Sequence, residues 1–215
     1  MEIKNGIVTR LDGIKIIQHL IPISNTLARP QYPMIPEYIT IHNTGNPGAS
    51  ALANSMYVDN VDTYKSWHFT VGSNEVYQEL PITESAWHAG DGKTGTGNRK
   101  SIGIEIAEVD GAEGTAIRFV AQLVNATKIK IENIVPHQRW SGKYCPRLIL
   151  PHWDKFIENI QKEMESDNMT VQEAEKIIQE KAGLDNNTMQ YLRFYRFSDA
   201  LLIKLAIAMN KLNQA

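Results

Sequence analysis

The chemistry that stands out in the sequence is carried by a histidine and a cysteine, His137 and Cys145, which lie eight positions apart. A Ser-Gly pair between them favours a turn, so their side chains can converge on one point. Imidazole and thiolate are favoured ligands of tetrahedral zinc, and a catalytic zinc site uses three protein ligands and leaves the fourth position to water. The third ligand must come from elsewhere. His42 is the best candidate because it ends an apolar run and precedes a loop.

The spacing alone leaves two other interpretations of this pair open. A single cysteine is often a small apolar core residue. A Cys–His pair is also the arrangement of a thiol nucleophile and its base, in which a cation such as Lys143 would favour the thiolate. The chain has one cysteine, which excludes an internal disulfide. A metal-free cysteine hydrolase that uses Cys145 and His137 therefore stays open beside the zinc site.

The elements that must position these residues follow from hydrophobic patterns. Short β-branched, aromatic or alternating runs predict strands at 38–42, 67–71, 75–80 and 101–106. Residues 49–58 look helical, and apolar residues at i, i+3, i+4 and i+7 predict helices through 117–124 and 153–160. Four prolines in 21–36 and four glycines in 90–98 predict loops. This mixture indicates an α/β or α+β domain over residues 1–165.

Residues 166–215 show helical patterns only and predict a small three-helix unit after a linker at 165–169. Thr170 and Glu173 fit a capping box, and Gly183 is placed to end that helix. A short middle helix is expected around 189–194. Ser198 and Asp199 are suited to cap a last helix with apolar residues on one face, Leu201, Leu205, Ala208 and Leu212. A unit of this size is near the lower limit for independent folding, so we expect it to dock on the first domain, on a second copy of itself or on a partner.

The composition excludes several classes of protein. Twenty-two basic against 24 acidic residues give a net charge of −2, which argues against a nucleic-acid binder. No apolar run approaches the roughly 20 residues that span a bilayer, so membrane insertion is not expected. The chain begins Met1-Glu2-Ile3-Lys4 and continues with polar residues, which is not a signal peptide, so we expect it to be made in the cytoplasm.

Four segments, in this order, resemble the type 2 N-acetylmuramoyl-L-alanine amidases: Tyr-Ile-Thr-Ile-His42-Asn-Thr, Ala-Trp-His88-Ala-Gly-Asp-Gly, Gly-Asn-Arg-Lys-Ser-Ile-Gly-Ile-Glu105-Ile and His137-Gln-Arg-Trp-Ser-Gly-Lys143-Tyr-Cys145-Pro. The resemblance spans roughly residues 35–160 and is greatest to the amidase domains of phage endolysins and autolysins that act on Gram-positive cell walls. It implies a central mixed β-sheet flanked by helices, with a metal in a groove on one face. Peptidoglycan recognition proteins share this fold, so the family also contains pure binders.

The resemblance implies roles for individual residues. The zinc ligands of the family fall on His42, His137 and Cys145, its acidic catalytic residue falls on Glu105, and its lysine beside the last ligand falls on Lys143. Three further positions match residues near the substrate groove of the family, and we predict that they contact substrate: Trp67, His68 and His88. A core or surface role is the alternative for each of them. More distant relatives carry a tyrosine where this chain has tryptophan before His68, so Trp67 is given no proton-transfer role.

The function implied is hydrolysis of the amide bond between N-acetylmuramic acid and L-alanine in bacterial peptidoglycan. Zinc lowers the pKa of bound water to about 7. Glu105 would serve as general base, and zinc and the Lys143 ammonium would stabilise the oxyanion. The expected protein is a phage or prophage endolysin that is released to the wall through a separate membrane lesion, with non-classical export as the alternative route. Its C-terminal helices would target the cell wall or form a homodimer. A non-catalytic peptidoglycan-binding module remains an alternative, although such modules usually lack a metal ligand.

Overall fold

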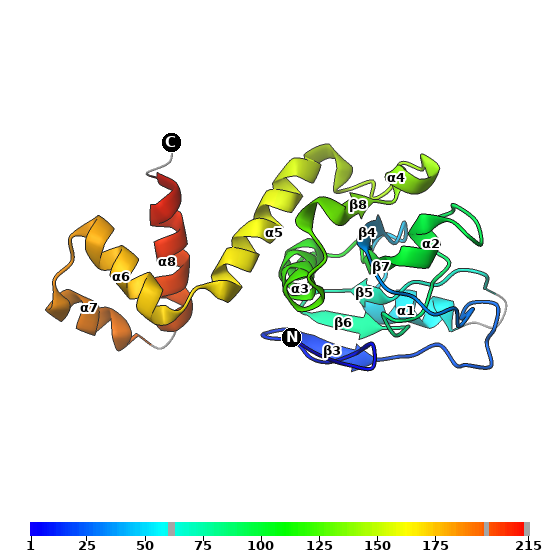
Figure 1. Cartoon of the computed structure of the whole chain (residues 1–215), viewed down its shortest axis with the longest axis horizontal. Coiled ribbons are helices and arrows are strands. Elements are labelled where there is room, and N and C mark those ends of the chain that lie inside the picture. Colours follow the sequence, from blue (N-terminus) through cyan, green and yellow to red (C-terminus); the bar gives the residue numbers. More distant parts are fainter. Residues whose placement is uncertain (60–62, 196–197, 213–215) are drawn as a thin grey trace. The chain divides into compact units, whose positions relative to one another are not determined.

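The computed structural model describes residues 1–59, 63–195 and 198–212, except the side chains of 166–168 and 210–212 (Figure 1). The chain divides into two units, Met1–Ile160 (unit 1) and Gln161–Ala215 (unit 2).

Unit 1 is built on a six-stranded mixed sheet. Its strands lie in the order β3 (Lys15–Gln18), β6 (Glu75–Gln78), β5 (Phe69–Val71), β7 (Ser101–Ile106), β4 (Tyr38–Asn43) and β8 (Ile134–Pro136). Neighbouring strands are parallel except β5 and β6, which form an antiparallel hairpin around Gly72-Ser73-Asn74. A separate hairpin joins β1 (Glu2–Lys4) and β2 (Ile7–Arg10). The mixed sheet is therefore confirmed, while β1, β2, β3 and β8 were not predicted.

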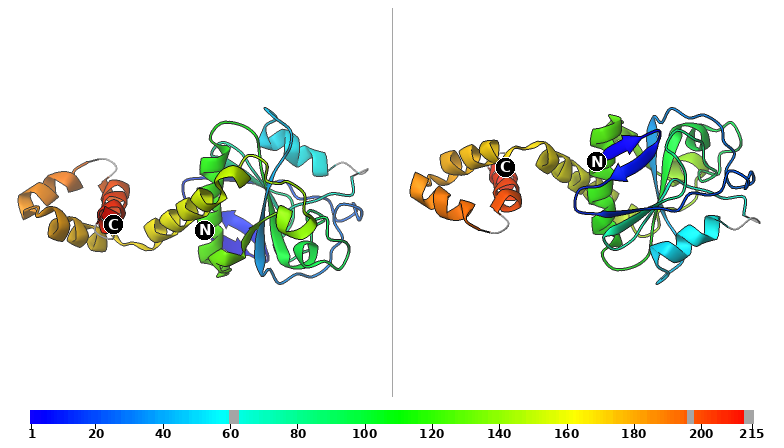
Figure 2. Two further views of the ribbon diagram at one scale, coloured as in Figure 1. Left: turned by 90° about the horizontal axis from the view of Figure 1, so that it is seen from above. Right: turned by 90° about the horizontal axis from the view of Figure 1, so that it is seen from below.

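Helices cover both faces of this sheet. Figure 2 shows α3 (Ala112–Thr127) on one side and α1 (Ala51–Val58) on the other. The remaining helices of this part of the chain are short, α2 (Thr96–Lys100) and α4 (Gln138–Ser141), together with the 3-10 turns η1 (Ile131–Asn133) and η2 (Leu150–His152) and the start of α5 (Trp153–Asn168). All three predicted helices are present. The predicted loop at 90–98 ends earlier than expected because α2 begins at Thr96.

The two faces of the sheet differ in chemistry because side chains alternate along each strand. The face toward α3 is apolar and at most 1% exposed, and Phe69 packs edge-on against Phe119 of α3 with ring centroids 4.9 Å apart. Its members are Ile39, Ile41, Phe69, Val71, Ile102, Ile104 and Ile106. Burying each such side chain stabilises the fold by about 1.5–3 kcal/mol. The opposite face carries polar residues, Thr40, His42, Thr70, Ser101 and Glu105. One face thus makes the core, and the other is left for chemistry.

Unit 2 contains α6 (Val171–Ala182), α7 (Asn186–Arg193) and α8 (Ser198–Leu212). The capping box at Thr170 and the left-handed Gly183, with φ of 64°, are both confirmed. Five buried residues form its core, Ala174, Ile178, Met189, Leu202 and Ala206.

Two predictions for this region were wrong. The linker expected at 165–169 is largely helical, since α5 continues to Asn168; no glycine or proline interrupts that stretch. The predicted apolar face of the last helix is also shifted. Leu201 and Leu205 are each 38% exposed, and Leu202 and Ala206 are buried in their place. Apolar residues surround α8 on nearly every side, so their spacing did not select one face. The side chain of Leu212 lies outside the described residues.

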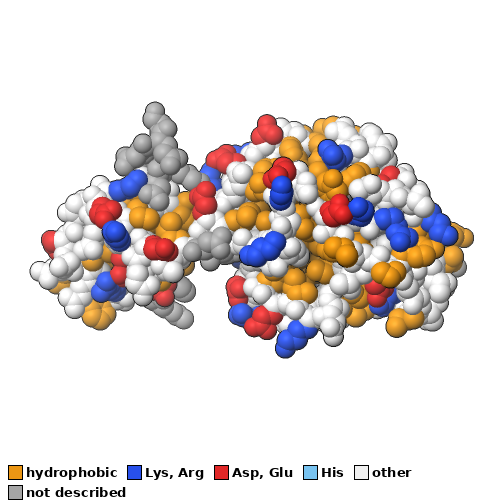
Figure 3. Space-filling model, in the orientation of Figure 1, with side chains coloured by type: hydrophobic (Ala, Val, Ile, Leu, Met, Phe, Trp, Pro, Cys, Tyr) orange, Lys and Arg blue, Asp and Glu red, His pale blue; other side chains and the backbone are white. Residues whose placement is uncertain are grey.

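The distribution of charged side chains on the surface agrees with the nearly balanced numbers of acidic and basic residues in the sequence. The face drawn in Figure 3 carries acidic and basic side chains interspersed with apolar ones. Among the described residues, no helix combines the length and the apolar character needed to cross a bilayer.

Candidate active site

The candidate metal ligands meet at the carboxyl ends of parallel strands. His42 near the end of β4 is in register with Glu105 of β7, and His137 directly follows β8. The backbone N–H of His137 donates to the Ile41 carbonyl at 3.2 Å, which sets the two histidines side by side. The carboxyl ends of parallel strands are the usual place for a ligand crevice in such sheets.

The turn after His137 carries Cys145 back to the same point. Helix α4 ends at Gly142 with φ of 75°, a conformation that favours glycine. The N–H of Gln138 donates to the Cys145 carbonyl at 3.0 Å and closes the turn. The Nε1 of Trp140 donates to the Thr40 hydroxyl at 2.8 Å and anchors α4 to the sheet.

His42, His137 and Cys145 form a compact set of donor atoms. The two Nδ1 atoms of His42 and His137 lie 3.0 Å apart, and the Cys145 Sγ lies 3.9 Å from the His42 Nδ1. One donor atom from each residue lies within 4.8 Å of the others, and all three side chains are buried. Ordinary zinc bond lengths in a tetrahedron place two nitrogens about 3.3 Å apart and a nitrogen and a sulfur about 3.6 Å apart. The donor set therefore fits a zinc ion.

Burial sets the protonation of these groups in the metal-free chain. It lowers the pKa of His42 well below 6.5 and also lowers that of His137, so both imidazoles are neutral, as metal ligands must be. Burial raises the pKa of the Cys145 thiol to about 11. A coordinated metal ion would deprotonate this thiol, whereas the protein alone does not activate it as a nucleophile.

Glu105 lies beside the cluster, with its Oε1 3.8 Å from the His42 Nδ1. Its side chain is 13% exposed, and its Oε2 is buried without a hydrogen-bond partner among the described residues. Burial raises the pKa of Glu105 to about 8, an effect that the nearby Lys143 and Lys65 ammonium groups reduce. A divalent cation at the cluster would lower the pKa of Glu105 and so favour its carboxylate form. A carboxylate in this position is placed to accept a proton.

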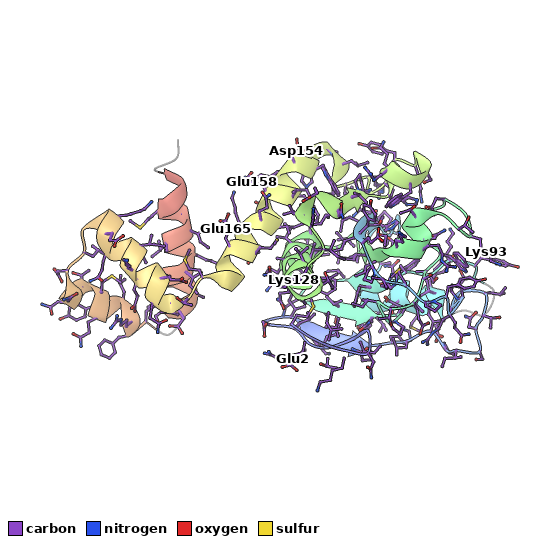
Figure 4. The ribbon with its side chains drawn as sticks, in the orientation of Figure 1. Glu2, Lys93, Lys128, Asp154, Glu158 and Glu165 are labelled. Carbon is purple, nitrogen blue, oxygen red and sulfur yellow. The ribbon has the colours of Figure 1, made fainter. Side chains whose placement is uncertain are left out.

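These groups line a pocket of about 520 Å³. Its wall includes all the predicted catalytic and metal residues except Cys145, and further polar and aromatic side chains, Asn54, Tyr57, Lys65, Trp67, Trp87 and His88. A second hollow of about 440 Å³ shares Trp87 and Gly90 with it. Lys93 borders that hollow and projects outward from the glycine-rich loop, residues 90–98 (Figure 4). The cluster thus opens onto a pocket that adjoins a second hollow at Trp87 and Gly90.

The three predicted substrate contacts lie in different surroundings. Trp67 lines the pocket, stacks on Tyr57 with centroids 6.3 Å apart, and donates from Nε1 to Thr70 at 2.7 Å. His88 lines the pocket and is 8% exposed.

His68 is fully buried. Its Nε2 donates to the Glu84 carbonyl at 2.8 Å, and its Nδ1 accepts the Gly103 N–H at 3.0 Å. It is absent from the described pocket lining, so its predicted contact with substrate has no support from this placement.

Sequence reasoning missed a clamp formed by Glu108. Its side chain is 3% exposed and accepts the Gly45 N–H at 3.1 Å. Both of its oxygens also accept from the Arg147 guanidinium. The loop after His42 and the segment after Cys145 are therefore held to one carboxylate. Only the register of β7 brings Glu108 here, so no local pattern could have predicted it.

Glu79, directly after β6, is a second residue that sequence reasoning missed. It is fully buried, and neither carboxyl oxygen has a hydrogen-bond partner of normal geometry in the described part of the chain. Burial raises the pKa of Glu79 well above 4.5, and the Ser55 and Thr70 hydroxyls offset part of this effect. Folding therefore favours the protonated acid at this position.

Comparison with known proteins identifies the family. The sequence pattern described as N-acetylmuramoyl-L-alanine amidase matches residues 31–148, more than half of the chain, and this range includes His42, Glu105, His137, Lys143 and Cys145. The chain belongs to this amidase family.

Individual relatives agree with this assignment. The amidase CwlH of Bacillus subtilis is 49% identical over 154 residues, covering 68% of this chain and 61% of CwlH. The amidase XlyA of the same organism is 50% identical, covering 68% of this chain and 51% of XlyA. The solved catalytic domain of XlyA matches with a TM-score of 0.65, covering 68% of this chain and 99% of that domain. The chain thus spans about half to three fifths of the length of these curated relatives.

Proposed function

We propose that this amidase-family chain is a zinc-dependent peptidoglycan hydrolase that cleaves the bond between N-acetylmuramic acid and L-alanine. The observation that carries the proposal is the cluster of His42, His137 and Cys145 donor atoms within 4.8 Å of one another, with Glu105 beside it. The relatives CwlH and XlyA, both named N-acetylmuramoyl-L-alanine amidases, support the same bond as substrate.

In this proposal each residue of the pocket has a separate role in the reaction. Zinc held by His42, His137 and Cys145 would supply a Lewis acid that activates water and polarises the scissile carbonyl. Glu105 accepts the proton of the attacking water and returns it to the leaving amine of L-alanine. The Lys143 ammonium, which lines the same pocket, stabilises the negative charge that develops on the carbonyl oxygen. Trp67, Trp87 and His88 offer surfaces for the sugar or the stem peptide.

Two observations weigh against the alternative functions. A cysteine hydrolase needs an accessible, activated thiolate, whereas Cys145 is 5% exposed and burial raises its pKa to about 11. A pure peptidoglycan binder has no need of a complete set of ligands with a buried carboxylate beside it, and here all three ligands and Glu105 are present.

The proposal extends to unit 2 and to the cellular role. The chain acts as an endolysin or autolysin on Gram-positive walls, and unit 2 serves for wall targeting or self-association. Three aromatic side chains on and after α7 support an interaction surface, since Tyr191, Phe194 and Tyr195 are 78%, 80% and 60% exposed.

Mass spectrometry of fragments released from purified peptidoglycan tests the reaction. The expected product is a stem peptide with a free L-alanine amine, matched by glycan with an intact lactyl carboxylate. The protein depleted of metal and the Glu105→Gln variant are the controls, and both should release little product. Products cut in the glycan chain or within the stem peptide would refute the proposed bond.

A further inference from the structure

The His88 ring connects a candidate metal ligand to the backbone. Its Nδ1 lies 3.0 Å from the Nε2 of His42, on the side of that ring away from the donor cluster. Its Nε2 lies 3.2 Å from the carbonyl oxygen of Ser101. A row of three polar groups thus runs from the backbone of β7 through two imidazoles to the His42 Nδ1.

The direction of these hydrogen bonds follows from the carbonyl at the end of the row. A carbonyl only accepts, so the Nε2 of His88 must carry the proton. His88 is 8% exposed, and burial disfavours a charged ring, so its Nδ1 is a lone-pair acceptor. The His42 Nε2 must therefore donate to it. A neutral imidazole carries a single N–H, so the Nδ1 of His42 is left with its lone pair.

We propose that His88 is a positioning residue of the metal site, which accepts the Nε2–H of His42 and thereby presents the unprotonated Nδ1 of His42 to the ion. This inference rests on the proposed zinc site and gives His88 a role other than contact with substrate. Metal-binding histidines commonly donate their other N–H to a carboxylate or a carbonyl. Here the acceptor is a second imidazole, His88, which in turn donates its own N–H to the Ser101 carbonyl.

Hydrogen bonds within the glycine-rich loop hold the backbone of His88 in place. The Asn98 side chain accepts the backbone N–H groups of His88 and Ala89 at 2.9 and 2.8 Å. Asp91 in turn accepts the N–H groups of Gly97 and Asn98. The glycine-rich loop is therefore folded around the backbone that carries His88.

Gly103 of β7 leaves room for the His88 ring. A Cβ at this position would lie 2.7 Å from the Cγ of His88, closer than such atoms approach, so a larger residue would displace the ring. The same Cβ would lie 2.9 Å from the His88 Nδ1, so Gly103→Ala perturbs the row while leaving His42, His88 and Ser101 themselves in place. Gly114 of α3 has nothing within 4 Å of such a Cβ, which makes Gly114→Ala a matched control.

Two readouts on the full chain test the proposal. Proton–nitrogen correlation spectra of the histidine rings in the metal-free protein should show both His42 and His88 protonated on Nε2. Competition titration with zinc should show affinity weakened about 10–100-fold in His88→Ala, the usual range for partners of a metal-binding histidine. His88→Asn, whose Oδ1 replaces the Nδ1 acceptor, should recover most of that affinity. Gly103→Ala should weaken zinc binding in the same direction, and Gly114→Ala should leave it unchanged.

A wild-type His42 ring protonated on Nδ1 would overturn the proposal, and so would a folded His88→Ala protein that binds zinc as tightly as the wild type. The ring spectra need neither a substitution nor a metal. A chain that binds no zinc but shows both Nε2–H rings would therefore refute the proposed function and support the hydrogen-bond row. Circular dichroism of each variant shows whether it is folded.

Discussion

Replacement of the buried Glu79 by glutamine should change how stability depends on pH. Burial raises the pKa of Glu79 in the folded protein well above its ordinary value of 4.5. Above about pH 4.5 the unfolded chain ionises this carboxyl while the folded chain keeps it protonated, so wild-type stability falls as the pH rises. The loss is about 1.4 kcal/mol per pH unit until the pH reaches the raised pKa. Glu79→Gln has nearly the same shape and does not titrate, so it escapes this loss.

The size of the effect makes it measurable. For a unit of about this length, 1.4 kcal/mol corresponds to roughly 3–6 °C in Tm. The Tm of Glu79→Gln should therefore gain about that much on the wild type for each pH unit above about pH 5. At about pH 4 and below the difference between the two proteins should stop changing with pH, because Glu79 is then protonated in both states.

Tryptophan fluorescence reports unit 1 alone, because all four tryptophans lie in it, Trp67, Trp87, Trp140 and Trp153. The melts are run with a chelator, since metal binding depends on pH itself. Glu132→Gln is the control: that carboxylate is 65% exposed, so its removal should leave the pH dependence as in the wild type. The same pH dependence in Glu79→Gln and the wild type would refute the reasoning.

Three further predictions concern the active site and the two units. Glu105→Gln should retain zinc while kcat falls by roughly 10²–10⁴-fold, as for loss of a general base; near-normal turnover in a zinc-loaded variant would contradict the assignment. Arg147→Ala removes the partner of the buried Glu108 carboxylate and should lower the free energy of unfolding by about 1–3 kcal/mol and weaken zinc binding, measured by denaturation and zinc titration. Unchanged values would show that the clamp does not hold the site. A fragment of residues 1–165 should fold and cleave soluble muropeptides but bind intact walls more weakly through lost multivalency. An unfolded fragment would place the helical tail in the core of the catalytic unit.

Residue types and local periodicity were enough for much of the fold. The apolar run before His42 and the alternation around Glu105 predicted β4 and β7, whose pairing places these two side chains in register. Thr170 and Gly183 marked the ends of α6 because capping is a local interaction. The last helix shows the limit of this approach, since its apolar residues lie on nearly every side of the helix and their periodicity does not select a buried face.

The sequence was enough to predict the candidate metal ligands, but not the residues that hold those ligands in place. His42, His137 and Cys145 are chemically distinctive residues that also match ordered motifs. Glu108 and the bond from His88 to His42 depend on strand register and side-chain direction between segments distant in sequence. A single sequence carries no local signal for such contacts, so they became visible only in the structure.

Zinc content and turnover, measured on one sample of the full chain, test the central claim most directly. Protein purified without added zinc should contain about one equivalent, as a single three-ligand site requires. Removal of that zinc should abolish cleavage of the muramic acid–alanine bond, zinc alone should restore it, and Cys145→Ala should lose both zinc and activity. Full wall-lytic activity in rigorously metal-free protein would contradict the account and favour a thiol hydrolase.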